Sequence, residues 1–167
     1  MNELFSFHEE LTEKEIGQFV NELSEVSLDS FIKAFEMGKN KIKEYPHCDS
    51  LIYSIATVLN ATLTLSDIDD EKKLECNNVI VEWLERTAES PNEKVRISSI
   101  FMLAAKYIQM EKYKEANIFL DKIPDTVIDA TIMKTNVLAH QEGTDIAAFF
   151  LEGKPVSYTH LTLPTIA

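Results

Sequence analysis

The chain has 167 residues, of which 45% are hydrophobic and 26% are charged, and this is enough to bury the core of one globular domain. Its net charge of -12 at pH 7 would repel the phosphates of nucleic acids, so we do not expect the chain by itself to bind DNA. It has no apolar run of about 18 residues and no basic start followed by an apolar stretch, which predicts a cytoplasmic protein without a membrane segment.

Two helices are predicted before Pro46. The first begins in the sequence LTEKEI, where Thr12 can cap the helix and Glu15 can complete a capping box. Its apolar residues recur at steps of three and four, which places them on one face: Ile16, Phe19, Leu23 and Val26. The second helix begins at Ser27 or Asp29 and ends before the proline, which cannot continue it.

The next two elements are also predicted to be helices. Asp49 or Ser50 opens the sequence LIYSIATVLNATLTL, whose β-branched residues make a strand conceivable. A length of about 16 residues without a turn signal favours a buried helix, because strands usually have about 4 to 8 residues. The acidic sequence DIDDE then suits the start of a fourth helix. In that helix we expect Trp83 to pack in the core together with Ile80 and Leu84.

A helical hairpin and a further long helix follow. Both arms of the hairpin carry apolar and small residues at steps of three, four and three: Ile97, Ile100, Ala104 and Tyr107 in one arm, and Tyr113, Ala116, Leu120 and Ile123 in the other. The connection QMEKYK is short enough only for an antiparallel return. After Pro124 a long helix begins with Asp125 or Thr126 as its cap and ends near Gly143, and a short helix TDIAAFFLEG follows.

The composition changes abruptly after residue 155. The sequence VSYTHLTLPT resembles the in-frame translation of an adapter used to prepare sequencing libraries, which implies that residues 156–167 are non-native and disordered. The alternative is a terminal strand or arm that docks on the body of the protein, favoured by the β-propensity of Val, Tyr and Thr. We therefore predict one native domain, residues 1–155, and assign no function to Tyr158 or His160.

The sequence LAAKYIQMEKYKEANIFL, residues 103–120, resembles the tetratricopeptide repeat. Its large, small and aromatic residues fall where that repeat places its own packing residues: Leu103, Ala104, Tyr107, Tyr113, Glu115, Ala116 and Leu120. Ala56 matches the small position of an earlier, weaker unit. Two departures are Glu111, which stands where the repeat has a turn glycine, and Pro124, which comes about four residues early. The resemblance implies an all-α fold of about seven or eight helices, a right-handed stack of antiparallel helical hairpins that forms a tetratricopeptide-like solenoid.

In such a stack the first helix of each hairpin lines the concave side, where a peptide can bind. The residues predicted to face this side are Tyr53, Thr57, Asn60, Ser98, Phe101, Ala105, Ile108 and Gln109, with Asn136 as a further candidate on the last long helix. An amide side chain can bond both a peptide N–H and a peptide C=O, and an aromatic ring supplies apolar contact area. The alternative for each residue is packing against the neighbouring hairpin.

A wider resemblance covers most of residues 1–155. The sequences NELFSFHEELTEKEI, IKEYPHCDSLIYSIATVLN and LDKIPD resemble the helical C-terminal region of Cro/repressor-type helix-turn-helix regulators of Firmicutes. This resemblance implies a regulatory domain that binds a protein or peptide partner and can form a homodimer. The chain departs from the family because it has no DNA-binding head before Thr12, so Met1 is an internal start or the head is a separate product. The alternative is a free-standing adaptor protein with no role in transcription.

The sequence contains no catalytic or metal-binding motif that we recognise. The nucleophile motif GxSxG and the phosphate-binding motifs GxxxxGKS, GxxxxGKT and GxGxxG are absent. Cys48 and Cys76 lack CxxC partners, and His8, His47 and His140 are scattered. The sequence DIDDE lacks the glycine and the final glutamate of an EF-hand loop. We therefore predict no enzyme activity, no catalytic residues, no cofactor and no metal, with both thiols reduced.

Overall fold

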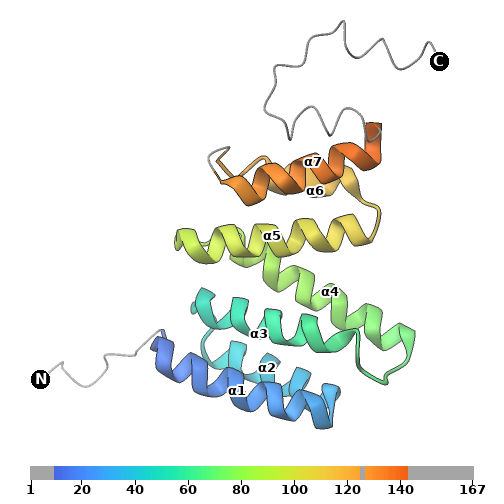
Figure 1. Ribbon diagram of the computed structural model, residues 1–167. Helices are drawn as coiled ribbons and strands as arrows, with labels where there is room; N and C mark the ends of the chain where they lie inside the picture. Colours follow the sequence, from blue (N-terminus) through green and yellow to red (C-terminus); the bar gives the residue numbers. More distant parts are fainter. Residues whose placement is uncertain (1–9, 125–126, 143–167) are drawn as a thin grey trace, which may run out of the picture. The chain divides into compact units, whose positions relative to one another are not determined.

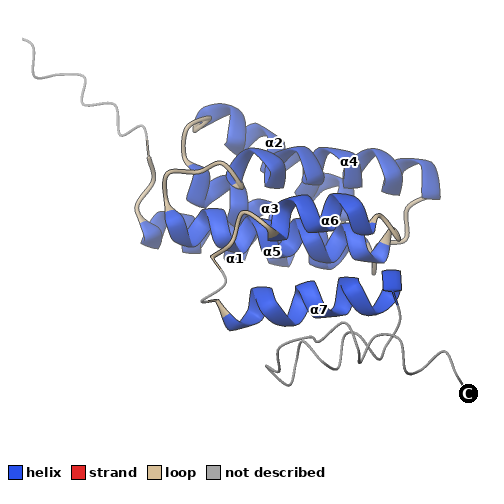
Figure 2. Cartoon of the chain, turned by 90° about the horizontal axis from the view of Figure 1, so that it is seen from above, coloured by secondary structure: helices blue, strands red, loops and turns tan. Residues whose placement is uncertain are grey.

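The computed structural model describes residues 10–124 and 127–142, and within these ranges it is all-α (Figures 1 and 2). This part of the chain forms seven helices: α1 (Glu13–Asp29), α2 (Phe31–Glu44), α3 (Asp49–Leu63), α4 (Asp70–Thr87), α5 (Glu93–Gln109), α6 (Tyr113–Leu120) and α7 (Ile128–Glu142). The chain divides into two compact units, residues 1–99 and residues 100–167, and the division falls inside α5. The all-α prediction is confirmed. None of the described helices combines the length and the apolar character that crossing a bilayer requires.

Side-chain caps fix where two helices of the first unit begin. Thr12 and Glu15 form the predicted capping box of α1: the Glu15 N–H donates to Thr12 Oγ1 at 3.3 Å, and the Thr12 N–H donates to Glu15 Oε2 at 2.9 Å. Asp69 caps α4, because its Oδ1 accepts the Lys72 N–H at 2.9 Å. The acidic sequence DIDDE therefore begins a helix, as predicted.

The start of α2 differs from the prediction. Ser27 and Asp29, the two predicted starts, are still part of α1, and α2 begins at Phe31. The reason is Ser30, whose extended backbone (φ -153°, ψ 107°) ends α1 and whose side chain accepts the Lys33 N–H to cap α2. One residue therefore joins two helices that pack against each other.

The core of the first unit lies around α3, which packs on α1, α2 and α4 (Figure 1). The helix predicted here is confirmed, and Ile52, Ile55 and Leu59 on its inner face are fully buried. Gly38 of α2 faces two of them: a Cβ atom added at Gly38 would lie 2.8 Å from Ile55 Cγ2 and 3.3 Å from Leu59 Cδ1. The missing side chain lets α2 approach α3 closely.

The inner face of α4 is formed by Ile80 and Leu84, which are fully buried as predicted. Trp83 is only half-buried, which corrects the expectation that it lies in the core. Its ring instead stacks on Phe35 of α2, with the ring centroids 5.8 Å apart. The Arg86 guanidinium at the end of α4 donates to the Pro46 carbonyl, which ties α4 to the turn between α2 and α3.

Small and aromatic residues pack the second unit. Ala104 of α5 and Ala116 of α6 are both fully buried. The Tyr107 ring of α5 stacks on the Phe119 ring of α6, with 5.6 Å between the centroids. α6 in turn packs on α7, where the Tyr113 ring stacks on the His140 ring at 5.4 Å. The small alanines are therefore buried within the unit, and the aromatic rings stack across its helix pairs.

The turn between α5 and α6 closes on a residue in the left-handed region. Glu111 has a φ of 58°, and it is the position at which the repeat has glycine. The Lys112 N–H donates to the Tyr107 carbonyl at 2.8 Å, and the Glu111 N–H donates to the Ile108 carbonyl at 3.0 Å. These two bonds form a Schellman motif, which usually has glycine at this position. The departure noted in the sequence is therefore a strained residue in an otherwise regular helix end.

Several predicted features lie outside the described residues. They are the caps Asp125 and Thr126, the short helix TDIAAFFLEG, His8 and the segment 156–167. The long helix predicted after Pro124 is confirmed as α7, which begins at Ile128.

Candidate functional site

The first unit has a hollow of about 360 Å³ on the side formed by α1, α3 and the start of α5, which we call the α1–α3–α5 groove. The residues that line it are Glu13, Ile16, Gly17 and Val20 from α1, Ser50, Tyr53 and Ser54 from α3, and Asn92, Lys94, Val95 and Ser98 at the start of α5. α2 and α4 contribute no residue to this lining. The groove is therefore built from alternate helices of the chain.

Helical spacing brings the lining residues together. Gly17 and Val20 lie about one turn apart on α1, and the same holds for Ser50 and Tyr53 on α3. Asn92 precedes α5, and its Oδ1 accepts the backbone N–H groups of Lys94 at 3.1 Å and Val95 at 3.3 Å. This cap fixes the direction in which α5 leaves the groove.

The groove combines an apolar part with a polar rim. Ile16 and Val95 are buried, and Val20 and Tyr53 are half-buried. The exposed charges among the lining residues are of opposite sign, Glu13 and Lys94. Gly17 is exposed, and a Cβ atom added there would meet no atom within 4 Å. The wall of the groove at Gly17 is therefore bare backbone with space in front of it.

The groove contains some of the predicted binding residues and not others. Tyr53 and Ser98 line it. Thr57 and Asn60 follow Tyr53 on α3 at helical spacing and are half-buried, and Thr57 Oγ1 donates to the Tyr53 carbonyl at 2.9 Å. The remaining predicted residues belong to the second unit: Phe101, Ala105 and Ile108 are half-buried, and Gln109 and Asn136 are exposed.

The residues assigned to repeat packing divide into two groups by burial. The aliphatic residues are fully buried, namely Ala56, Leu103, Ala104, Ala116 and Leu120. The aromatic residues, Tyr107 and Tyr113, are half-buried.

Comparisons with protein-family models, with curated proteins and with solved structures give no significant match. Function therefore has to be inferred from the residues and their geometry.

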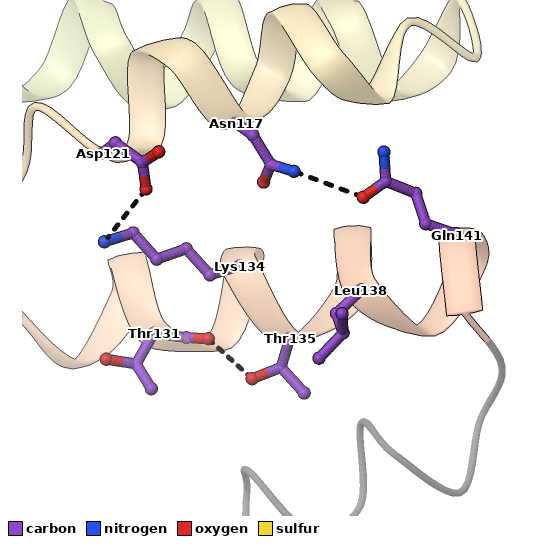
Figure 3. Close-up of a pocket in the computed structure, with 7 residues that line it drawn as sticks. All are labelled: Asn117, Asp121, Thr131, Lys134, Thr135, Leu138 and Gln141. Carbon is purple, nitrogen blue, oxygen red and sulfur yellow. Dashed lines mark hydrogen bonds and ion pairs between the residues drawn. The ribbon is translucent and has the colours of Figure 1, made fainter.

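The second unit has a larger hollow of about 620 Å³ between α6 and α7 (Figure 3). Its polar side chains bond across the two helices: Asn117 Nδ2 donates to Gln141 Oε1 at 3.3 Å, and Lys134 Nζ lies 3.8 Å from Asp121 Oδ1. Asn136, the predicted candidate on α7, is absent from its lining. The bonds between its polar groups link α6 to α7, and none of the residues predicted to bind a ligand lines this hollow.

Sequence reasoning missed several groove residues. Gly17 interrupts an amphipathic helix, where glycine costs about 1 kcal/mol relative to alanine, so its presence was a usable signal. Asn92 follows Pro91 directly before a helix and carried the signal of an N-cap. Ser50 and Ser54 carried no such signal, because short polar residues on a helix are common.

The described residues show no arrangement typical of metal or thiol chemistry. They contain no group of three or more His, Cys, Asp or Glu side chains placed to hold an ion. Cys48 and Cys76 are both buried and form no disulfide. Burial, followed by the charge of Glu75, raises the pKa of the Cys76 thiol, which lowers its reactivity.

Proposed function

We propose that this chain is a helical-repeat domain that binds a peptide segment of a partner protein in the α1–α3–α5 groove. The observation that carries the proposal is that the lining comes from α1, α3 and the start of α5 and from neither α2 nor α4, as expected if α1, α3 and α5 are the first helices of successive hairpins. In stacked hairpins these first helices form the concave, ligand-binding side. The proposal includes a right-handed tetratricopeptide-like stacking of the hairpins.

The side chains of the groove suit a peptide. Ile16, Val20 and Val95 offer apolar surface to a partner side chain. Tyr53 adds an aromatic ring whose O–H can bond a peptide group. Gly17 allows a peptide backbone to approach α1 closely, since no side chain stands in front of it. The groove thus provides the mixture of apolar area and a few polar groups that peptide sites use.

We propose further that the domain belongs to a transcriptional regulator, pairs with itself and passes the binding event to a DNA-binding head. The resemblance of the sequence to helix-turn-helix regulators supports this assignment. The net charge of -12 is consistent with a regulator in which another segment contacts DNA, because this chain would repel the phosphates. Sequencing the genomic DNA upstream of the codon for Met1 tests it: the expected result is an in-frame helix-turn-helix coding sequence. Its absence would favour the free-standing adaptor.

Peptide binding is tested by selecting random peptides of about 12 residues, displayed on phage, against the immobilised chain. Fluorescence anisotropy then measures the affinity of selected peptides for two groove variants. Gly17→Phe adds a ring at a lining position where a Cβ atom meets no neighbour within 4 Å, and Tyr53→Ala removes the aromatic ring of the lining. We expect each variant to weaken binding by about tenfold or more.

Asn78→Phe is the matched control, because it adds the same ring at an exposed position of α4 outside the groove. It should leave the affinity unchanged. Selected peptides that bind both groove variants as tightly as the unaltered chain would show that the groove is not the binding site.

A further inference from the structure

The first unit has a second hollow at the other ends of α1 and α3, which we call the corner hollow. It has a volume of about 370 Å³ and lies between the α1–α2 junction, residues 27–32, and the end of α3 with its connection to α4, where residues 62 and 65–68 line it. Gly17 and Leu28 are eleven positions apart on α1, or about 16 Å at the helical rise per residue. The corner hollow is therefore distinct from the α1–α3–α5 groove.

Large apolar side chains stand exposed around the corner hollow. Leu28 and Leu65 are 81% and 83% exposed, the highest values among the large hydrophobic residues that the structure describes. Ile32, which is 38% exposed, lines the same hollow. Single exposed leucines are ordinary, but three large apolar residues gathered around one concavity are typical of a docking surface.

The hydroxyl groups of the corner hollow are already bonded within the chain. Ser27 Oγ donates to the Ser24 carbonyl at 2.7 Å, and Ser66 Oγ donates to the Leu63 carbonyl at 2.6 Å. Thr62 Oγ1 donates to the Val58 carbonyl at 3.0 Å. These hydroxyl groups therefore do not need a polar ligand to satisfy their hydrogen bonds. The rest of the surface offers mainly apolar side chains and carboxylates.

The charges at the corner hollow are all negative. Asp29 and Asp67 are exposed and line it, and no Lys, Arg or His does. α1 and α3 both end here, and neither has a basic residue in its last turn, whereas α2 ends with Lys41 and Lys43. The N-terminus of α2 also lies here and offsets part of the field of these two C-termini, so the negative charge of the hollow rests mainly on Asp29 and Asp67.

We propose that the corner hollow is a docking site for a basic amphipathic helix of a partner protein. A large apolar side chain of the partner packs against Leu28 and Leu65, and its flanking Lys or Arg residues face Asp29 and Asp67. Nucleic acid and anionic membranes are disfavoured because the same field repels them. A second copy of this chain is disfavoured because two-fold pairing at this surface would bring two acidic surfaces together without a basic residue in either lining.

The probe is a fluorescent peptide of about 12 residues with leucine on one helical face and lysine on the other, compared with a version that has glutamate in place of lysine. Anisotropy titrations with the full chain should show binding of the lysine peptide only, and binding should weaken as salt increases. Leu28→Ser with Leu65→Ser should reduce the affinity by about tenfold or more. Both leucines are exposed, so circular dichroism should show unchanged helix content.

Two matched controls separate the site from general attraction to an acidic protein. Asp29→Asn with Asp67→Asn should reduce the affinity by about fivefold, whereas Glu22→Gln with Glu82→Gln removes the same charge elsewhere and should leave it nearly unchanged. Leu74→Ser with Ile118→Ser, also at exposed positions, should have no effect. Equal losses in both charge variants, or full binding by the Leu28 and Leu65 variant, would overturn the proposal.

Two further outcomes are decisive. Gly17→Phe should leave the affinity for the lysine peptide within about twofold, because distant sites act independently. A tenfold loss would place the peptide in the α1–α3–α5 groove and overturn the corner site. Sedimentation velocity tests whether a second copy of the chain occupies the corner hollow. If the chain is a dimer and Leu28→Ser with Leu65→Ser converts it to a monomer, this surface is a self-association face and the proposal is overturned.

Discussion

The two units differ in how well their residues fit the positions they occupy. In the first unit Gly38 stands where any side chain would collide with Ile55. In the second unit Glu111 has a φ of 58°, in a region that favours glycine, and Lys106, a residue usually found on the surface, is only 9% exposed. The first unit thus uses glycine where packing requires it, while the second closes despite two unfavourable residues. It follows that a side chain at Gly38 should destabilise the first unit, whereas substitutions at Glu111 and Lys106 should stabilise the second.

The largest effect is expected at Gly38. Gly38→Ala places a Cβ atom 2.8 Å from Ile55 Cγ2, so α2 and α3 must separate or the Ile55 side chain must shift. Overpacking of this kind costs about 1 to 3 kcal/mol, which exceeds the gain of about 1 kcal/mol from replacing a helical glycine. We expect a net loss of up to about 2 kcal/mol in the free energy of unfolding. Trp83, the only tryptophan, lies in this unit and reports the transition by fluorescence during urea titration.

A second variant identifies the cause. Ile55→Leu removes the Cγ2 methyl group that the new Cβ would meet, so adding it to Gly38→Ala should restore part of the lost stability. If Gly38→Ala is as stable as the unaltered chain, the close approach of α2 and α3 is not what fixes glycine at this position.

A smaller, stabilising effect is expected at Lys106. Burial lowers the pKa of its ammonium group below the usual 10.5. Lys106→Met keeps a long apolar side chain and removes the charge whose desolvation lowers this pKa, so we expect a small gain in the free energy of unfolding near neutral pH. Chemical unfolding monitored by circular dichroism at pH 7 measures the difference.

The stability of the unaltered chain should depend on pH through Lys106. Because the folded pKa is lowered, the unfolded state binds more protons between the folded value and 10.5. The free energy of unfolding should therefore rise with pH through that window in the unaltered chain. Lys106→Met should lack this contribution, so its advantage should shrink as the pH increases. An advantage that is constant from neutral pH to above 10.5 would mean that the buried charge is not its source.

Glu111 should give a gain of similar or smaller size. Glu111→Gly relieves the left-handed conformation, which costs a residue with a side chain about 1 to 2 kcal/mol, but it also increases the entropy of the unfolded chain. We expect a net gain of about 0.5 to 1 kcal/mol. Glu111→Ala is the matched control, because it removes the charge and keeps the strain. If alanine stabilises the chain as much as glycine does, charge and not backbone conformation limits this turn.

Local sequence signals determine most of the fold. Thr12 with Glu15 predicted the start of α1, and the length of the apolar segment at α3 distinguished a helix from a strand despite its β-branched residues. The start of α2 was misplaced because Ser27, Asp29 and Ser30 are all good caps, and only tertiary packing decides among them.

The candidate sites were less predictable. Tyr53 could be predicted from helical spacing, but Gly17 and Lys94 line the same groove only because α1 packs on α3 and the start of α5 reaches this hollow. The corner hollow could not be foreseen at all, because it depends on where α1 and α3 end relative to each other. Periodicity indicates which face of a helix is buried, and it says little about which helix ends meet.

Substitution of Gly17 should give the smallest change in stability, and its sign should be opposite to that at Gly38. Both glycines lie inside helices of the first unit, but a Cβ atom at Gly17 has open space around it. Gly17→Ala should therefore stabilise the chain by about 0.5 to 1 kcal/mol, the ordinary helix preference of alanine over glycine. If the groove binds a peptide backbone against α1, the methyl group added by Gly17→Ala should lower the affinity for the phage-selected peptides. Gly38→Ala should change that affinity only by changing the fraction of folded chain. A Gly17→Ala variant that is more stable and binds those peptides equally well would mean that glycine serves neither packing nor binding at this position.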